Sequence, residues 1–113
     1  MREPATVFSH DAKRRAGEIE GFTFGSDVSV IVVEYGVAGM GPKLHTHPYA
    51  ETFIVIEGQA TFEVGAERID AVAGMALVAP AGVPHRFENA GPGRLLQVDI
   101  HSSDRFVTEW LEP

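Results

Sequence analysis

Short runs of β-branched and aromatic residues, interrupted about every eight to twelve residues by turn-forming residues, follow one another along most of this chain. Each run is rich in Val, Ile, Phe or Thr, and most are bounded by glycine or proline. The runs cover residues 19–24, 28–37, 42–47, 51–57, 60–64, 67–72, 75–79, 84–89 and 94–101. Strands this short and this evenly spaced predict an all-β sandwich or barrel.

The chain of 113 residues has the length of one domain, and its sequence contains no linker and no repeat of fixed period. We assign residues 1–18 to an N-terminal arm and residues 19–113 to a single barrel domain. The C-terminal stretch SDRFVTEWLEP fits a short helix, or a strand on which Phe106, Thr108 and Trp110 share one face. A tryptophan so close to the end predicts that this tail docks on the barrel or on a partner subunit.

Charge and composition narrow the range of partners. The formal net charge of −7 opposes binding to nucleic acid and to anionic membranes. There are no cysteines, which excludes disulfides, thiolate catalysis and cysteine-ligated zinc. The N-terminal stretch MREPATVFSHDAKRR lacks the apolar core of a signal peptide, and no run approaches the roughly 20 apolar residues of a membrane helix. We therefore expect a cytoplasmic protein whose ligands are small molecules.

The predicted strand 51–57 is apolar on both faces. Its odd-numbered side chains share one face and its even-numbered side chains share the other, because side chains alternate along a strand. A small barrel has only one interior, so the second face needs a cover from another element or another subunit. Ile54 and Ile56 on the outer face favour a homodimer interface.

Two histidines separated by one residue, His45 and His47, lie in the stretch GPKLHTHPYAE. The strand period places both on one face, and Glu51 opens the next strand after the turn at Pro48. Two imidazoles and a carboxylate on adjacent strands can form a facial set for a divalent transition metal. His85, which opens strand 84–89, is available as a fourth ligand. Taken singly, each of these residues also fits an ordinary loop or core position.

The sequence around these residues resembles the cupin superfamily. Residues 39–58, GMGPKLHTHPYAETFIVIEG, match the first cupin motif, G-x5-H-x-H-x3-E-x6-G, at every fixed position. Residues 74–89, GMALVAPAGVPHRFEN, match the second motif, G-x5-P-x-G-x2-H-x3-N, in the same way. Only 15 residues separate the two motifs, as in a small single-domain cupin.

This resemblance implies a double-stranded β-helix, the jelly-roll barrel of cupins, usually as a dimer. It also implies one divalent transition metal per chain, bound by His45, His47, Glu51 and His85. Three imidazoles and a carboxylate suit Fe, Mn, Ni, Cu or Zn, so the residues do not distinguish the metal. Glu51 is expected to be a ligand that can also act transiently as a base.

The side chains that share a face with the ligands are expected to line a substrate pocket. Strand parity selects residues Tyr35, Met40, Lys43, Phe53 and Phe87. Such a pocket is mostly apolar, which suits a small organic substrate bound to the metal through oxygen rather than a phosphorylated one.

The run 94–101 alternates between polar and apolar residues and has two interpretations. Either Gln97, Asp99 and His101 face inward and support the metal ligands, or the apolar side chains of 96, 98 and 100 fill the interior. Burying three polar side chains is costly unless each is hydrogen-bonded, so the second orientation is favoured.

The site and the resemblance together predict a metal-dependent enzyme, with dioxygenase-like chemistry as the first choice. A non-oxidative isomerase or cyclase that uses the metal to polarise a substrate oxygen is the main alternative. A third hypothesis is a small-molecule-binding cupin without catalysis. The fold itself does not decide between them.

Overall fold

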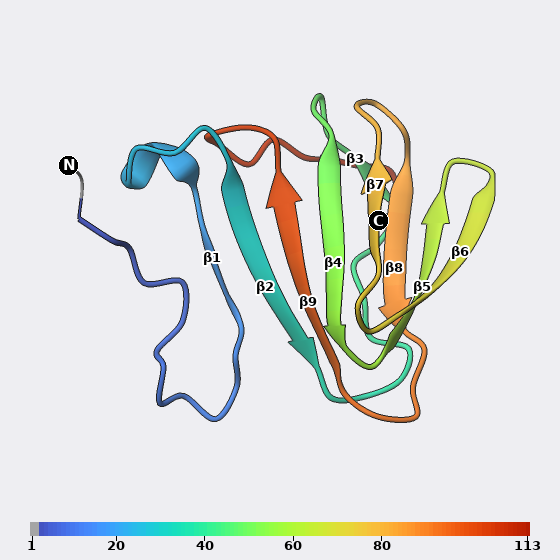
Figure 1. Ribbon diagram of the computed structural model, residues 1–113. Coiled ribbons are helices and arrows are strands. Elements are labelled where there is room, and N and C mark those ends of the chain that lie inside the picture. Colours follow the sequence, from blue (N-terminus) through green and yellow to red (C-terminus); the bar gives the residue numbers. More distant parts are fainter. Residues whose placement is uncertain (1–2) are drawn as a thin grey trace.

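The computed structural model describes residues 3–113, which form two five-stranded antiparallel sheets that face each other (Figure 1). The first sheet has the strand order β1-β2-β9-β4-β7 and the second has the order β10-β3-β8-β5-β6. The strand bounds are β1 Gly17–Ile19, β2 Ser29–Tyr35, β3 His45–Thr46, β4 Glu51–Glu57, β5 Gln59–Val64, β6 Glu67–Val72, β7 Ala76–Ala79, β8 His85–Asn89, β9 Leu95–His101 and β10 Glu109–Trp110. This architecture confirms the predicted all-β jelly roll.

Helical structure is nearly absent from the described residues. Residues 3–113 contain one 3-10 turn, η1 (Gly21–Thr23), and no helix long and apolar enough to cross a membrane. The C-terminal tail takes the strand alternative, since β10 pairs antiparallel with β3. The first strand begins at Gly17, within the segment assigned to the N-terminal arm, and Arg15 is held to Glu34 of β2 by a 3.0 Å ion pair.

The strand predicted at residues 19–24 is wrong over most of its length, because the chain turns back on itself at Gly21. A side chain at this position would lie 2.3 Å from the carbonyl oxygens of Ser26 and Val28, so the turn requires glycine. The hydroxyl of Ser29 accepts the Gly21 N–H at 2.9 Å. The aromatic residues around Gly21 suggested a strand, but this close backbone approach determines the local fold.

Three phenylalanines from three strands tie the two sheets together. Phe53 of β4 lies 4.9 Å from Phe62 of β5 and 6.0 Å from Phe87 of β8, measured between ring centroids. All three rings are buried in one apolar cluster. Such aromatic contacts combine a large buried area with favourable edge-to-face geometry.

The orientation favoured for residues 94–101 is also wrong. Gln97, Asp99 and His101 are the inward residues, and each is at most 3% exposed. The cause is the register between β9 and β4, which pairs them with Val55, Phe53 and Glu51 respectively. Residues directly opposite each other on paired strands face the same side, so the inward face of β4 determines that of β9.

The outer face of this sheet is mostly apolar and only partly covered within the described chain. Arg15 contacts Glu34, which lies beside Leu96 in the strand register, and both Glu34 and Leu96 are buried. Val98 and Ile100 of β9 lie beside Ile54 and Thr52 of β4 in the strand register. Ile56 is 46% exposed, although strand 51–57 was expected to be buried on both faces. A homodimer interface on this face stays a prediction.

The turn between β4 and β5 depends on Gly58, which has a φ of +83° and no space for a side chain. An added Cβ would lie 2.2 Å from the Arg94 carbonyl oxygen. Gly74 has a comparable φ of +94° but open space around it. We expect Gly74→Ala to lower the free energy of unfolding by roughly 1–2 kcal/mol, the cost of a left-handed alanine. We expect Gly58→Ala to lower it by about 3 kcal/mol or more, because a backbone clash adds to that strain.

Chemical denaturation of the two variants beside the native protein checks this difference. Equal losses for both substitutions would contradict the steric role of Gly58.

Candidate metal centre

Four buried side chains from the two cupin-like motifs converge at one end of the barrel. They are His45 in β3, His47 immediately after it, Glu51 at the start of β4 and His85 at the start of β8. Each offers one ligand atom, and these atoms all lie within 4.8 Å of one another. The structure therefore brings together all four residues that the sequence indicated, and they form a candidate metal site.

Backbone carbonyls hold the three imidazoles in a defined tautomer. The Nδ1 atoms of His45, His47 and His85 lie 2.7, 2.8 and 2.9 Å from carbonyl oxygens. The acceptors are Lys43, Val107 and Val83 respectively. A carbonyl oxygen can only accept, so each Nδ1 carries the hydrogen and each neutral ring keeps a lone pair on Nε2. This is the arrangement in which histidine binds metals.

The lone pairs meet the carboxylate of Glu51. The Nε2 atoms of His47 and His85 lie 3.0 and 3.1 Å from Glu51 Oε1. Two acceptors at this separation repel each other unless a proton or a metal cation lies with them. His47 Nε2 is also buried without a hydrogen-bond partner, and such an atom is costly to leave unpaired. These residues therefore fit a divalent cation.

The electrostatics favour an ionised Glu51 and act on the surrounding rings in different directions. Burial alone would raise the pKa of Glu51, but the surrounding His101, His47 and His85 hold it well below its usual range. Burial lowers the pKa of His45, which favours its neutral form. For His85 burial acts in the same direction, yet the nearby Glu51 carboxylate and the Val83 carbonyl leave its pKa raised.

A fourth imidazole, His101, supports Glu51 from the other side. Its Nε2 lies 3.1 Å from Glu51 Oε2, and its Nδ1 lies 2.7 Å from the hydroxyl of Tyr49. That hydroxyl accepts the Val107 N–H at 3.2 Å and has its own proton to donate to His101. His101 then carries its hydrogen on Nε2, opposite to the three motif histidines, and lies beside the carboxylate, although this contact does not have hydrogen-bond geometry.

Sequence reasoning set His101 aside when it favoured the other face of its strand. The signal that identifies it is the pairing Glu51↔His101, which a single sequence does not reveal.

A cavity of about 220 Å³ opens beside the ligands. Its remaining wall is largely apolar and aromatic, with Ile31, Val33, Tyr35, Phe87, Phe106 and Trp110. Asp99 also lines it and receives a 2.7 Å hydrogen bond from the Gln97 amide. Burial, together with the charge of Glu51, raises the pKa of Asp99 well above its ordinary value.

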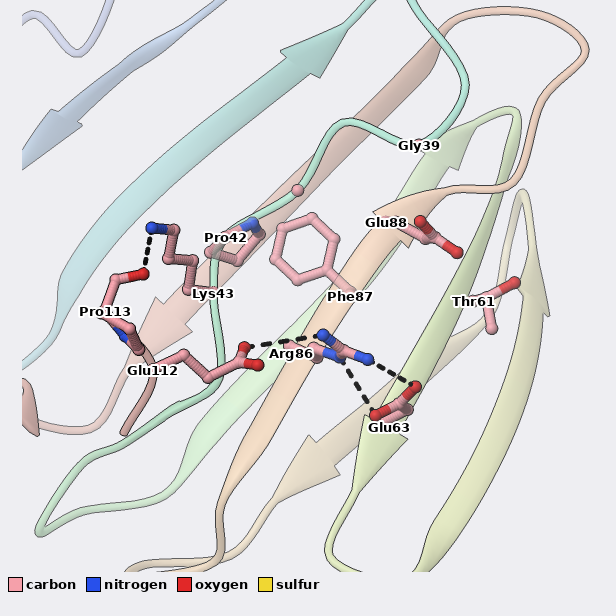
Figure 2. Close-up of a pocket in the computed structure, with 11 residues that line it drawn as sticks. Gly39, Pro42, Lys43, Thr61, Glu63, Arg86, Phe87, Glu88, Glu112 and Pro113 are labelled. Carbon is pink, nitrogen blue, oxygen red and sulfur yellow. Dashed lines mark hydrogen bonds and ion pairs between the residues drawn. The ribbon is translucent and has the colours of Figure 1, made fainter. Parts of the chain in front are cut away.

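The five residues expected in the substrate pocket fall into four places. Tyr35 and Phe87 line the cavity beside the ligands. Phe53 lies in the core, 1% exposed, and Met40 is 41% exposed and outside that lining. Lys43 lines a different groove, of about 520 Å³, on the outside of β8 (Figure 2). Alternation along a strand shows which side chains share a face with the ligands, but not whether they lie in the core or at the cavity.

The comparisons with known proteins agree with this architecture. The family model described as Cupin domain matches residues 31–101. A double-stranded β-helix protein from Klebsiella pneumoniae superposes with a TM-score of 0.72 at 22% identity, covering 95% of this chain and 91% of that one. No curated protein sequence matches the chain at a significant level.

Two enzymes with solved structures share the fold. Oxalate decarboxylase from Bacillus subtilis, described with Mn(II) centres, superposes with a TM-score of 0.75 at 23% identity. The match covers 85% of this chain but 27% of that enzyme. Oxalate oxidase in complex with glycolate gives a TM-score of 0.74 at 17% identity, over 94% of this chain and 60% of that one. At these identities the likeness establishes the fold.

Substitution of the histidines should separate ligands from supporting residues. We expect His47→Ala to weaken binding of Mn(II) or Co(II) more than about 100-fold, and His101→Ala to weaken it about 10-fold. His10→Ala is the matched control, because His10 is exposed and outside the cluster, and its metal affinity should equal the native value. Calorimetric titration measures all three, and equal losses for His47 and His101 would refute the distinction.

Bound metal should be released as the pH falls through about 6, close to the ordinary pKa of histidine. Metal binding requires neutral imidazoles, so protons compete with the cation below that pH. The pKa of His85 is raised and that of His45 is lowered, so protons compete for His85 more strongly than for His45. Metal content after equilibration across a pH series checks this, and full retention down to about pH 4.5 would contradict it.

Proposed function

Because the chain belongs to the cupin family, we propose that it is a metal-dependent enzyme acting on a small, oxygen-bearing organic substrate. The metal is a divalent transition ion held by His45, His47, Glu51 and His85. The observation that carries the proposal is the convergence of buried Nε2 lone pairs and a buried carboxylate beside an open cavity. Dioxygenase-like chemistry is the version we favour.

The ligand set suits Fe, Mn, Ni, Cu or Zn. Mn(II) is the first ion to test, since Bacillus subtilis oxalate decarboxylase is described with Mn(II) centres. A bound divalent ion would polarise a coordinated substrate oxygen.

The residues that line the cavity indicate which net charge a substrate can have. Among the described residues that line it, none is a lysine or arginine. A dianion would therefore have only the metal to compensate its charge in a largely apolar space, which is costly. A neutral or singly charged enol, ketone, phenol or organic acid fits better.

Asp99 provides a second polar group facing the same space. Its raised pKa favours the protonated form of the carboxyl, which can donate a hydrogen bond to a substrate oxygen. The Gln97 side-chain amide donates a hydrogen bond to Asp99 Oδ1 and so fixes the position of the carboxyl.

A non-oxidative isomerase or cyclase is the second candidate. It is favoured by the presence at one cavity of Glu51, whose pKa is lowered, and Asp99, whose pKa is raised. Two carboxyl groups whose environments push their pKa values apart suit proton removal and proton return. Binding of a small molecule without catalysis is the third.

We also propose a homodimer formed through the outer face of β4 and β9.

The metal requirement separates the two enzymatic candidates. We expect protein reconstituted with Mn(II) or Fe(II) to consume O₂ in the presence of catechols or β-diketones, and the Zn(II) form to consume none, because Zn(II) has no redox chemistry. An oxygen electrode measures the uptake, with His47→Ala protein as the control. Turnover by the Zn(II) form without O₂ uptake would instead support the isomerase, and no turnover with any metal would refute both.

A further inference from the structure

The chain after β9 crosses the end of the barrel that contains the ligands. β9 belongs to the first sheet and β10 to the second, so residues 103–113, here named the C-terminal strap, connect the two sheets across this end. In Figure 1 the strap is the red segment that runs along the upper end of the molecule.

The first half of the strap is anchored near η1. The Phe22 N–H donates to the Asp104 carbonyl at 3.1 Å, and the Phe106 N–H donates to Glu20 Oε2 at 3.0 Å. The Arg105 guanidinium lies 3.9 Å above the centre of the Phe22 ring. These contacts fix where the strap leaves the first sheet.

The second half is anchored on β3 and β8, in the groove that Figure 2 shows. Glu112 accepts the Leu44 N–H at 2.6 Å and lies 3.5 Å from the Arg86 guanidinium, which is also paired with Glu63. Lys43 contacts the Pro113 carbonyl (Figure 2). Four charged groups of this groove thus pair with one another or with the strap, namely Lys43, Glu63, Arg86 and Glu112. The groove therefore holds the second half of the strap.

Between its anchors the strap contacts the candidate metal site. The Val107 carbonyl accepts the hydrogen of His47 Nδ1, and the Trp110 ring lies 5.0 Å from the ring of His45. Phe106 contacts His101 at a ring separation of 4.9 Å. The strap therefore touches two proposed ligands and the histidine that supports the third.

Strand-like alternation turns one edge of the strap into a wall of the cavity. Phe106, Thr108 and Trp110 line the cavity, while Val107 and Leu111 do not and are 50% and 43% exposed. Trp110 is itself 59% exposed, so little else packs over this segment. A segment with few buried contacts opens at low free-energy cost compared with the core strands.

We propose that the C-terminal strap is the specificity-determining wall of the metal cavity, with Trp110 stacking on a planar chelating substrate. This inference rests on the proposed metal site. Trp110 provides an aromatic face next to a ligand ring, and Tyr35 and Phe87 add aromatic surface to the same cavity. Aromatic faces favour flat, conjugated ligands over short aliphatic ones of the same charge.

Trp110 is the single tryptophan of the chain and reports directly on this arrangement. We expect Co(II), a paramagnetic ion, to quench its fluorescence in step with metal uptake measured independently by elemental analysis. Glu112→Ala removes the contacts to Leu44 and Arg86 and should speed metal release to EDTA about fivefold, through loss of a charge-assisted anchor. Glu109→Ala, an exposed carboxylate on the same strap, should release metal at the native rate.

Binding of two chelators to the Co(II)-loaded protein tests specificity. Trp110→Ala should weaken tropolone, a planar ring, about fivefold while leaving oxalate unchanged, in line with a stacking contribution. Leu111→Ala, whose side chain is outside the cavity lining, should alter neither affinity. Equal losses for both chelators would overturn the stacking role.

The outcomes distinguish this inference from the proposed function. Absence of Co(II) uptake by the native protein would refute the metal site itself. Normal uptake without quenching of Trp110, or release rates for Glu112→Ala equal to those for Glu109→Ala, would refute the strap and leave the metal site standing.

Discussion

The arrangement of side chains at this end of the barrel depends on one buried carboxylate, that of Glu51. Glu51 is 3% exposed, and an ionised carboxylate in such a place requires compensation by cations or hydrogen-bond donors. Its Oε1 faces His47 and His85, and its Oε2 faces His101. A divalent cation among the lone pairs would compensate the negative charge of the buried Glu51 carboxylate. The need for this compensation and the candidate metal site therefore both follow from the burial of Glu51.

The orientation of the rings around this carboxylate depends on three backbone carbonyls, two of them close in sequence and one distant. Lys43 and Val83 each lie two residues before the histidine that they fix, so the local turn provides the acceptor. His47 differs, because its acceptor, Val107, lies 60 residues away on the C-terminal strap. One ligand is therefore oriented only when the strap is in place, which couples the chain end to the metal site.

The sequence predicts the parts of this molecule that depend on local pattern. The motif spacing identified all four clustered residues. Short strands with regular turns predicted an all-β sandwich or barrel, and the cupin resemblance implied that it is a jelly roll. The errors arise where contacts distant in sequence decide. Gln97, Asp99 and His101 face inward because β9 pairs with β4. The sequence favoured the opposite orientation, because burying the apolar Val98 and Ile100 costs less free energy than burying polar side chains. The turn at Gly21 follows from a backbone approach that propensity does not encode.

The inward orientation of the polar side chains of β9 has a consequence for function. Burial of Asp99 and His101 is tolerated because Gln97, Tyr49 and Glu51 lie within hydrogen-bonding distance of them. The cavity thus has a carboxyl of raised pKa but no lysine or arginine among its described lining residues. A divalent cation at the candidate site would be the one positive charge available to a dianion in this cavity, so sharing a fold with enzymes of oxalate does not by itself make oxalate the natural ligand.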